Sequence, residues 1–368
     1  MSLVRVRLGD VVVGEVERFD DAFDTHVFRW SAEYRTTPER PVLGQYMEDR
    51  LDRPLVTHGL TPWFEHLLPQ GPLRGAVARD AGVDPNDGLA LLAWLGEDLP
   101  GAVRVEVVRA LRARPRRESV PVASADPAAV FRVSLPGVQW KLSLHATQKG
   151  LTLPTKGVEG EWIAKFHADA FPRIVALEDA TLRWAAFVGV DVPVHRVVRC
   201  DDIDGLPEDV PRGDGEALVI DRFDRSPSGR IHVEDFGQVL DRPPGLSQYR
   251  GAYEEIGAVI RALCPDDRRE FVRRVVFNCV WWWRRAPEEL GPALLTALRA
   301  VVPCVRPRPD RRVSPRGPAR ALARGLVHLH GRHPRSLRPP RRGPGPRARY
   351  RAGVGGPRRR PRPRGVGG

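Results

Sequence analysis

The chain of 368 residues lacks any apolar run long enough to cross a membrane, and its first residues, MSLVRVRLGDVVVGEVER, contain no apolar signal segment. Its four cysteines are far apart and never show the C-x-x-C spacing of common zinc sites. So few cysteines also argue against a disulfide scaffold. These absences predict a cytoplasmic protein that has no membrane partner.

Lysine is also scarce, with four residues against 55 arginines. Arginine, alanine, glycine and proline are favoured by GC-rich codons, whereas lysine is not, so the composition indicates a GC-rich, bacterial genome. A lysine that persists in such a genome is a candidate functional residue. The four are Lys141, Lys149, Lys156 and Lys165.

Acidic residues are scarce in one region only. Residues 301–368 hold 20 arginines, 13 prolines and one acidic residue, Asp310, so this tail carries a charge of +19. The whole chain carries +13, which leaves −6 for residues 1–300. The basic character therefore belongs to the tail and does not predict a nucleic-acid-binding surface on the folded part.

Hydrophobic periodicity predicts an α+β protein in which a small first subdomain precedes strands and then helices. Residues 3–17 alternate like a β-hairpin, residues 61–80 show helical spacing around a Pro and a Gly, and a strand is expected at 101–108. A strand–turn–strand is expected over 131–146, with further strands near 162–165, 194–200 and 216–223. Helices are expected near 174–190, 232–240, 253–264 and 267–280.

Two lysines lie in contexts that suit phosphate binding. The turn before Lys141 can present backbone N–H groups to phosphates, although an ordinary hairpin explains this turn better when it is taken alone. Lys165 ends the apolar strand WIAK, so its stem should be buried and its charge should need a partner. Glu178 in the following helix is the expected partner, as in kinase-like folds. The alternative is an exposed lysine at a strand end.

A third candidate is the segment ALVIDRFDRS, in which an apolar strand runs into Asp221, Arg222, Phe223, Asp224 and Arg225. In a two-lobed nucleotide-binding fold, a hinge at this place would offer backbone groups to adenine. The alternative is a strand end that is closed by an ion-paired turn. Each of these signals is weak, but their order along one chain is much more specific.

That order resembles the HipA family of bacterial serine/threonine kinase toxins. The resemblance implies an N-terminal subdomain at 1–115, a kinase N-lobe at 125–225 and a partial, incomplete helical C-lobe at 226–283. The implied two-lobed protein-kinase-like fold is distantly similar to lipid kinases. The segments that carry the resemblance are PWFEHLLPQG, LLAWLGEDLPGAV, FRVSLPGVQWKLSL, WIAK, LE at 177–178, LVIDRFDR, HVEDFGQVL, QY at 248–249 and VVFNCV.

The resemblance also implies ATP and Mg²⁺ as cofactors. Residues 134–141 match the phosphate-binding loop, and Ser134 matches a serine that is autophosphorylated in some members. A helix-turn-helix antitoxin of the HipB type is the implied partner, through which DNA would be contacted indirectly, and the implied substrate is a protein of the translation machinery. The residues that match the ATP site are Ser134, Gly137, Gln139, Lys141, Lys165, Glu178, Asp221 and Phe223.

The catalytic part departs from the family pattern. After FN-x-V the family reads approximately G-N-x-D-A-H-x-K-N, whose Asp orients the substrate hydroxyl and whose Asn holds Mg²⁺. A later P-A-Y-D motif supplies a further metal-binding Asp. In this chain the loop position falls at Arg284–Glu289 and the metal position at Arg306, so neither catalytic nor metal residues are intact.

The three consecutive tryptophans at 281–283 indicate a shift of reading frame. Tryptophan has the single codon TGG, and three such codons followed by an arginine codon, read one base later, encode Gly-Gly-Gly. The same shift permits D-A-H-L-K-N at 284–289 and S-P-A-Y-D-L-V at 302–308. We therefore expect that the frame slipped near codon 280, through mutation or through a sequencing fault, and that 284–368 is a disordered tail.

Two functions are consistent with these patterns. The first is a HipA-like, ATP-dependent protein serine/threonine kinase that is catalytically dead in this chain. The alternative is a non-catalytic protein that binds an antitoxin through residues 1–280 or binds nucleic acid through the basic tail. Because the tail contains almost no aromatic residues, such nucleic-acid binding should be nonspecific and sensitive to salt.

Overall fold

The computed structural model describes residues 2–109, 139–154, 158–168, 171, 173–245, 248 and 252–285, the last five by their backbone alone. All described elements belong to one compact unit, Met1–Gly325, whereas the second unit, Leu326–Gly368, lies outside the described residues. The prediction for the tail beyond Arg285 also falls outside them. Within the described part, no helix has both the length and the apolar character that crossing a bilayer requires.

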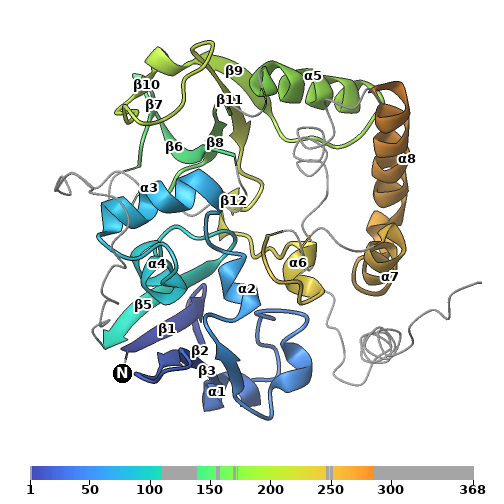
Figure 1. Cartoon of the computed structure of the whole chain (residues 1–368). Helices are drawn as coiled ribbons and strands as arrows, with labels where there is room; N and C mark the ends of the chain where they lie inside the picture. The colour runs from blue at the N-terminus through green and yellow to red at the C-terminus, as the bar shows by residue number, and fades with distance from the viewer. Residues whose placement is uncertain are drawn as a thin grey trace, which may run out of the picture. The chain divides into compact units, whose positions relative to one another are not determined.

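The chain begins with a five-stranded antiparallel sheet in the order β4-β3-β2-β1-β5 (Figure 1). Its first hairpin confirms the predicted alternation, because Val4, Val6 and Leu8 of β1 are buried. Gly9 turns the chain with φ of 59°, a left-handed conformation that glycine adopts without strain. The strands are β1 (Ser2–Leu8), β2 (Val11–Arg18), β3 (Thr25–Trp30), β4 (Leu55–His58) and β5 (Val103–Arg109).

The predicted helical spacing at 61–80 becomes two helices with a break between them. Pro69 lies in the break, where its missing N–H would interrupt a continuous helix. The side chain of Asp87 caps the next helix by accepting a hydrogen bond from the Ala90 N–H at 3.0 Å. The helices of this region are α1 (Ala32–Thr36), a 3-10 helix (Glu48–Arg50), α2 (Pro62–Glu65), α3 (Gly71–Ala81) and α4 (Gly88–Trp94).

A second sheet of six strands follows in the order β10-β7-β6-β8-β11-β9. The strands predicted at 162–165, 194–200 and 216–223 are confirmed. The second strand of the strand–turn–strand predicted at 131–146 is also confirmed, as β6 from Lys141 onward, whereas its first strand lies outside the described residues. The strands are β6 (Lys141–Thr147), β7 (Gly150–Thr152), β8 (Trp162–Lys165), β9 (His195–Arg199), β10 (Ile203–Asp204) and β11 (Glu216–Asp221).

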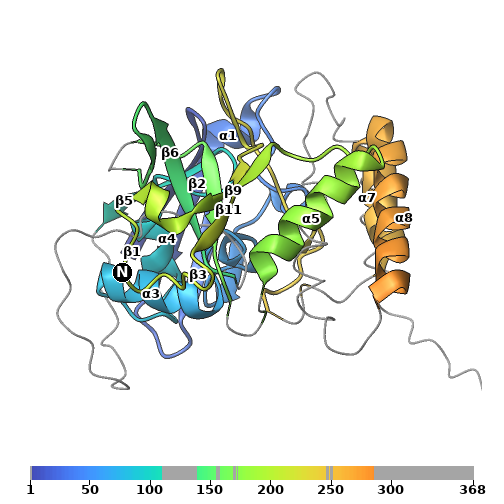
Figure 2. The same ribbon diagram turned by 90° about the horizontal axis from the view of Figure 1, so that it is seen from above.

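The long helix α5 (Ile174–Phe187) lies beside β9 and β11 (Figure 2). Leu182 and Ala185 on this helix belong to one buried cluster with Leu218 and Ile220 of β11. Packing against the sheet therefore orients α5, and this orientation decides which of its polar residues reach the end of strand β8.

One hydrophobic core joins the first sheet to the second. It includes Val105 from β5, Leu92 from α4, Leu144 from β6 and Val219 from β11. A short two-stranded ribbon, β12 (Arg225–Ser226) and β13 (Gly229–Arg230), follows β11. The subdomain borders predicted near residues 115 and 225 stay predictions. One continuous cluster of buried side chains contains residues from both sides of the first border.

The last described part is helical, as predicted. Helices α6 (Phe236–Val239), α7 (Tyr253–Leu263) and α8 (Arg268–Arg285) follow one another. Helix α8 extends five residues beyond its predicted end at 280. One face of α8 is packed, since Phe277 lies 5.1 Å from the Trp184 ring, but Val272, Val276 and Val280 on another face are 57%, 55% and 46% exposed.

Two of the segments that carry the family resemblance, PWFEHLLPQG and HVEDFGQVL, meet in space. Buried Glu234 accepts hydrogen bonds from the Trp63 indole N–H at 2.8 Å and from the Gln45 N–H at 3.0 Å. Nearby, Nδ1 of His66 lies 3.1 Å from Asp235, and the Gln238 amide donates to the Trp63 carbonyl at 3.1 Å. These contacts tie the first subdomain to α6 across more than 160 residues of sequence.

The protonation of Glu234 makes the stability of the fold at this junction depend on pH. Burial raises the pKa of Glu234 from 4.5 to about 8, and the hydrogen bonds from Trp63 and Gln45 oppose this rise only in part. The negative charges of Asp235 and Glu48 raise the pKa further. The folded protein thus holds a proton that the unfolded chain releases between these two values, so this group lowers stability as pH rises across that window.

We predict that Glu234→Gln flattens this dependence, because the amide keeps an oxygen for Trp63 and cannot ionise. The free energy of unfolding of the wild type should lose up to about 1.4 kcal/mol per pH unit more than that of the variant. Urea unfolding at about pH 5.5 and pH 7.5 measures this, with the exposed Glu254→Gln as control. Parallel pH profiles for the wild type and Glu234→Gln would contradict the prediction.

Candidate functional site

Two of the four lysines face each other across neighbouring strands. Lys141 is the first residue of β6, Lys165 is the last residue of β8, and the antiparallel register places them directly opposite. Residues paired in this way lie on the same face of a sheet, with Cβ atoms about 5 Å apart. Two positive charges at such a separation repel, so this arrangement calls for a nearby anion.

Glu178 on α5 supplies that negative charge within the protein. Its carboxylate forms an ion pair with the Lys165 ammonium, and the Glu178 side chain is 1% exposed. The expected contact between the strand lysine and the helix acid is therefore confirmed. The second carboxylate oxygen of Glu178, Oε2, is buried and makes no hydrogen bond among the described residues.

Lys141 has an unusual electrostatic environment. Burial, together with the positive charge of Lys165, lowers the pKa of Lys141 from 10.5 to about 7, although the attraction of Glu178 opposes this shift. Near neutral pH this lysine is therefore poised between its neutral and its charged form. A polyanion bound beside it would favour the charged form.

Gln139 continues the site from the segment before β6. Its amide donates to the Phe166 carbonyl at 3.0 Å, directly after Lys165, and its own oxygen is buried without a partner among the described residues. The predicted turn residues Ser134 and Gly137 lie outside the described residues. The structure thus brings Gln139, Lys141, Lys165 and Glu178 together at one end of β6 and β8.

The remaining two predicted residues lie at the end of β11. Asp221 is the last residue of that strand, and its N–H donates to the Val194 carbonyl at 2.8 Å. Phe223 is 39% exposed, whereas Arg222 between them is completely buried. The alternative interpretation of this segment, a strand end closed by an ion-paired turn, describes its contacts correctly.

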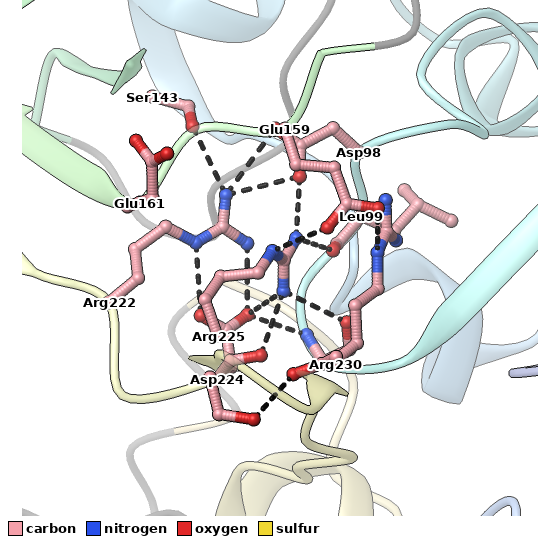
Figure 3. A network of polar contacts seen from close by, with 12 residues as sticks. Asp98, Leu99, Ser143, Glu159, Glu161, Arg222, Asp224, Arg225 and Arg230 are labelled. Atoms are coloured by element: carbon pink, nitrogen blue, oxygen red, sulfur yellow. Dashed lines mark hydrogen bonds and ion pairs between the residues drawn. The ribbon is translucent and has the colours of Figure 1, made fainter. Parts of the chain in front are cut away.

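That ion-paired turn includes residues that the sequence patterns did not single out (Figure 3). Arg222 donates to Asp224 and to Asp98, and Arg225 donates to both of the same carboxylates. Glu159 adds ion pairs to Arg225 and to Arg230. Asp98 and Glu159 carry no local signal of this role, except that Asp98 lies in the family-like segment LLAWLGEDLPGAV.

The described residues contain no group of three or more His, Cys, Asp or Glu side chains that could hold a metal ion. Of the expected catalytic loop at 284–289, Arg284 and Arg285 end helix α8, and the other positions lie outside the described residues. Arg306, where the metal-binding Asp is expected, also lies outside them.

Comparisons with known proteins match both halves of this architecture. Residues 4–106 match the HipA N-terminal domain, and residues 133–282 match the HipA-like C-terminal domain. A relative from Sinorhizobium fredii, named "Putative kinase Y4dM", is 37% identical over 288 residues, which cover 76% of this chain and 69% of the relative. A second, "Putative kinase Y4mE" from the same organism, is 30% identical over 207 residues and is matched over 46% of its length.

Among solved structures, a HipA chain from Shewanella oneidensis, in a complex with HipB and operator DNA, is similar at 20% identity and a TM-score of 0.49. The match covers 75% of this chain and 68% of that one. The described sheets and helices make this chain an α+β protein. It belongs to the HipA family, as the two domain matches and the 37% identical relative show.

We predict that Glu178→Gln lowers the free energy of unfolding by about 3 kcal/mol, because it leaves the largely buried Lys165 without an anionic partner. Arg183→Gln on the same helix is the matched control. It breaks the exposed ion pair with Asp179 and should cost about 0.5 kcal/mol or less. Denaturant unfolding measures both variants. Equal losses would show that the Lys165–Glu178 pair contributes no more than a surface pair.

Proposed function

We propose that this chain is a HipA-family protein that binds ATP through the lobe built on β6, β8 and α5. The observation that carries this proposal is the Lys165–Glu178 ion pair beside the opposed Lys141. An ATP triphosphate would neutralise the two lysines, and Lys165 would contact the α- and β-phosphates while Glu178 holds it in place. Ser134 and Gly137 would complete the phosphate-binding loop, with Gln139 at its end.

At the other end of the paired strands β8 and β11, Asp221 and Phe223 would receive the adenine. The backbone of Asp221 ends β11 close to Val194, and Phe223 is exposed enough to contact a planar base. ATP therefore fits the residues present. Mg²⁺ does not fit the described residues, since they offer no cluster of metal ligands, and we derive no step that passes through it.

We further propose that the family's serine/threonine kinase activity is lost in this chain through a shift of reading frame. The C-terminal family match ends at residue 282, inside the run of tryptophans, which supports this proposal. Without the loop Asp, the loop Asn and the second metal Asp, nothing orients the substrate hydroxyl or neutralises the transferring phosphoryl group. Ser134 would then match the serine that is autophosphorylated in some members, but this chain would not phosphorylate it.

Purified full-length protein should incorporate no radiolabel from γ-labelled ATP with Mg²⁺, because phosphoryl transfer depends on positioning and on neutralisation of charge. Incorporation should fall short of that of an intact relative by several orders of magnitude. A gene in which one base is added or removed near codon 280, so that the loop D-A-H-L-K-N is restored, is the matched comparison. Robust labelling of the unaltered chain would refute the proposed loss, and resequencing codons 275–310 tests the frame itself.

Affinity for ATP should fall as the pH rises from about 7 to 9, because Lys141 loses its charge in this range when the site is empty. The fall can reach at most about tenfold per pH unit. Lys141→Arg should remove most of this dependence, since a guanidinium stays charged. Isothermal titration calorimetry at three pH values measures it, with the exposed Lys149→Arg as control. An affinity of the wild type that is constant from pH 7 to 9 would contradict the assignment of Lys141.

The partner that we propose is a helix-turn-helix antitoxin of the HipB type, bound through residues 1–280, with DNA reached through that antitoxin. The intact family activity would be directed at a protein of the translation machinery. A second candidate function rests on the +19 charge of residues 301–368, which would hold nucleic acid through phosphates. Filter binding that does not weaken with added salt would exclude this second function.

A further inference from the structure

In the sequence, Arg222 lies between Asp221 and Phe223, the two residues to which we assign the adenine, and its side chain is buried. Arg222 is 1% exposed, whereas Phe223 beside it is 39% exposed. The N–H of Arg222 donates to the Glu161 carbonyl at 2.8 Å, and its side chain donates to Ser143 at 3.2 Å. Ser143 lies on β6, so the side chain of Arg222 also contacts that strand.

The charge that holds Arg222 from the far side comes from the first subdomain. Oδ1 of Asp98 lies 3.1 Å from Nη1 of Arg222 and 2.6 Å from Nη2 of Arg225. Oδ2 of Asp224 accepts from the same two side chains at 2.9 Å each. Two carboxylates thus bridge two guanidiniums, and this arrangement balances the charge of a group of buried side chains (Figure 3).

The backbone after Asp98 completes the clamp. The Gly101 N–H donates to Asp224 Oδ2 at 2.8 Å, while the Leu99 and Gly101 carbonyls accept from Arg225 at 3.2 and 3.1 Å. Gly101 has φ of 70°, and a Cβ there would lie 2.9 Å from the Val233 nitrogen, so a glycine is required. Burial alone would raise the pKa of Asp224, but hydrogen bonds and charge from Arg222 and Arg225 hold it below its usual value.

The geometry points to Asp98 as a positioning residue for the adenine end of the nucleotide site: from the first subdomain, it holds Arg222 and Arg225 so that Asp221 and Phe223 keep a fixed backbone course. This inference rests on the proposed binding of ATP. It gives the first subdomain a part in nucleotide recognition, although Asp98 does not touch the nucleotide. Since the Lys165–Glu178 pair lies outside this ion network, the phosphate end should keep its affinity when Asp98 is changed.

The test uses the full chain and two ligands, ATP and inorganic tripolyphosphate, titrated by calorimetry at a temperature at which circular dichroism shows each variant folded. Asp98→Asn should weaken ATP binding by about tenfold and change the affinity for tripolyphosphate less than about twofold. Asp98→Glu keeps the charge but moves the carboxylate by one methylene group. Asp98→Glu should also weaken the binding of ATP more than that of tripolyphosphate, but to a smaller degree. This variant replaces Asp98→Asn in the test if Asp98→Asn fails to fold.

Asp209→Asn is the matched control, since it breaks an exposed ion pair with Arg79 that also joins the first subdomain to the later part of the chain. It should change neither affinity. Equal losses of ATP and tripolyphosphate affinity in both Asp98 variants would show a general structural role and overturn the inference, as would unchanged ATP affinity. A wild-type chain that binds neither ligand would instead refute the proposed function, and the inference would fall with it.

Discussion

The arrangement of the lobe depends on how a positive charge is kept at the end of an apolar strand. Lys165 ends β8, and its side chain is only 13% exposed, so its ammonium group needs an anion within reach. Glu178 meets this need only if α5 lies across the sheet at one angle and in one register. The apolar contacts of Leu182 and Ala185 with β11 set that angle. The ion pair and the apolar packing therefore favour the same arrangement of α5 on the sheet.

Local patterns predicted the elements well, because their causes are local. Alternation of buried and exposed positions gave the first hairpin, and Pro69 with Gly71 gave the break between α2 and α3. The pairing of Lys165 with Glu178 could also be predicted, since the two are 13 residues apart in a strand and the helix that follows it. The sequence placed these features because chain connectivity restricts where such close neighbours can lie.

Contacts over long sequence separations could not be predicted in the same way. Asp98 and Arg222 are 124 residues apart, and Trp63 and Glu234 are 171 residues apart. Nothing in the periodicity of either segment names its partner, because any buried arginine could have met any of several acidic residues. The opposed position of Lys141 also depended on strand order, since β6 and β8 could have paired in another register. The sequence contains these segments in the order that the family has. That order predicts the family but not which residues of the segments contact one another.

Helix α8 illustrates the difference between helix formation, which depends on nearby residues, and burial, which depends on residues far away in the sequence. It continues through the tryptophans to Arg285, because helix propagation needs only residues that tolerate helical dihedrals, and the next proline along the chain is Pro287. Burial is a different matter, since it needs a partner surface from elsewhere in the chain. The half-exposed Val272, Val276 and Val280 lie four residues apart along one face, the spacing of a helix face that normally packs. A helix can form without a partner surface, so α8 keeps its helical backbone to Arg285 while Val272, Val276 and Val280 stay half-exposed.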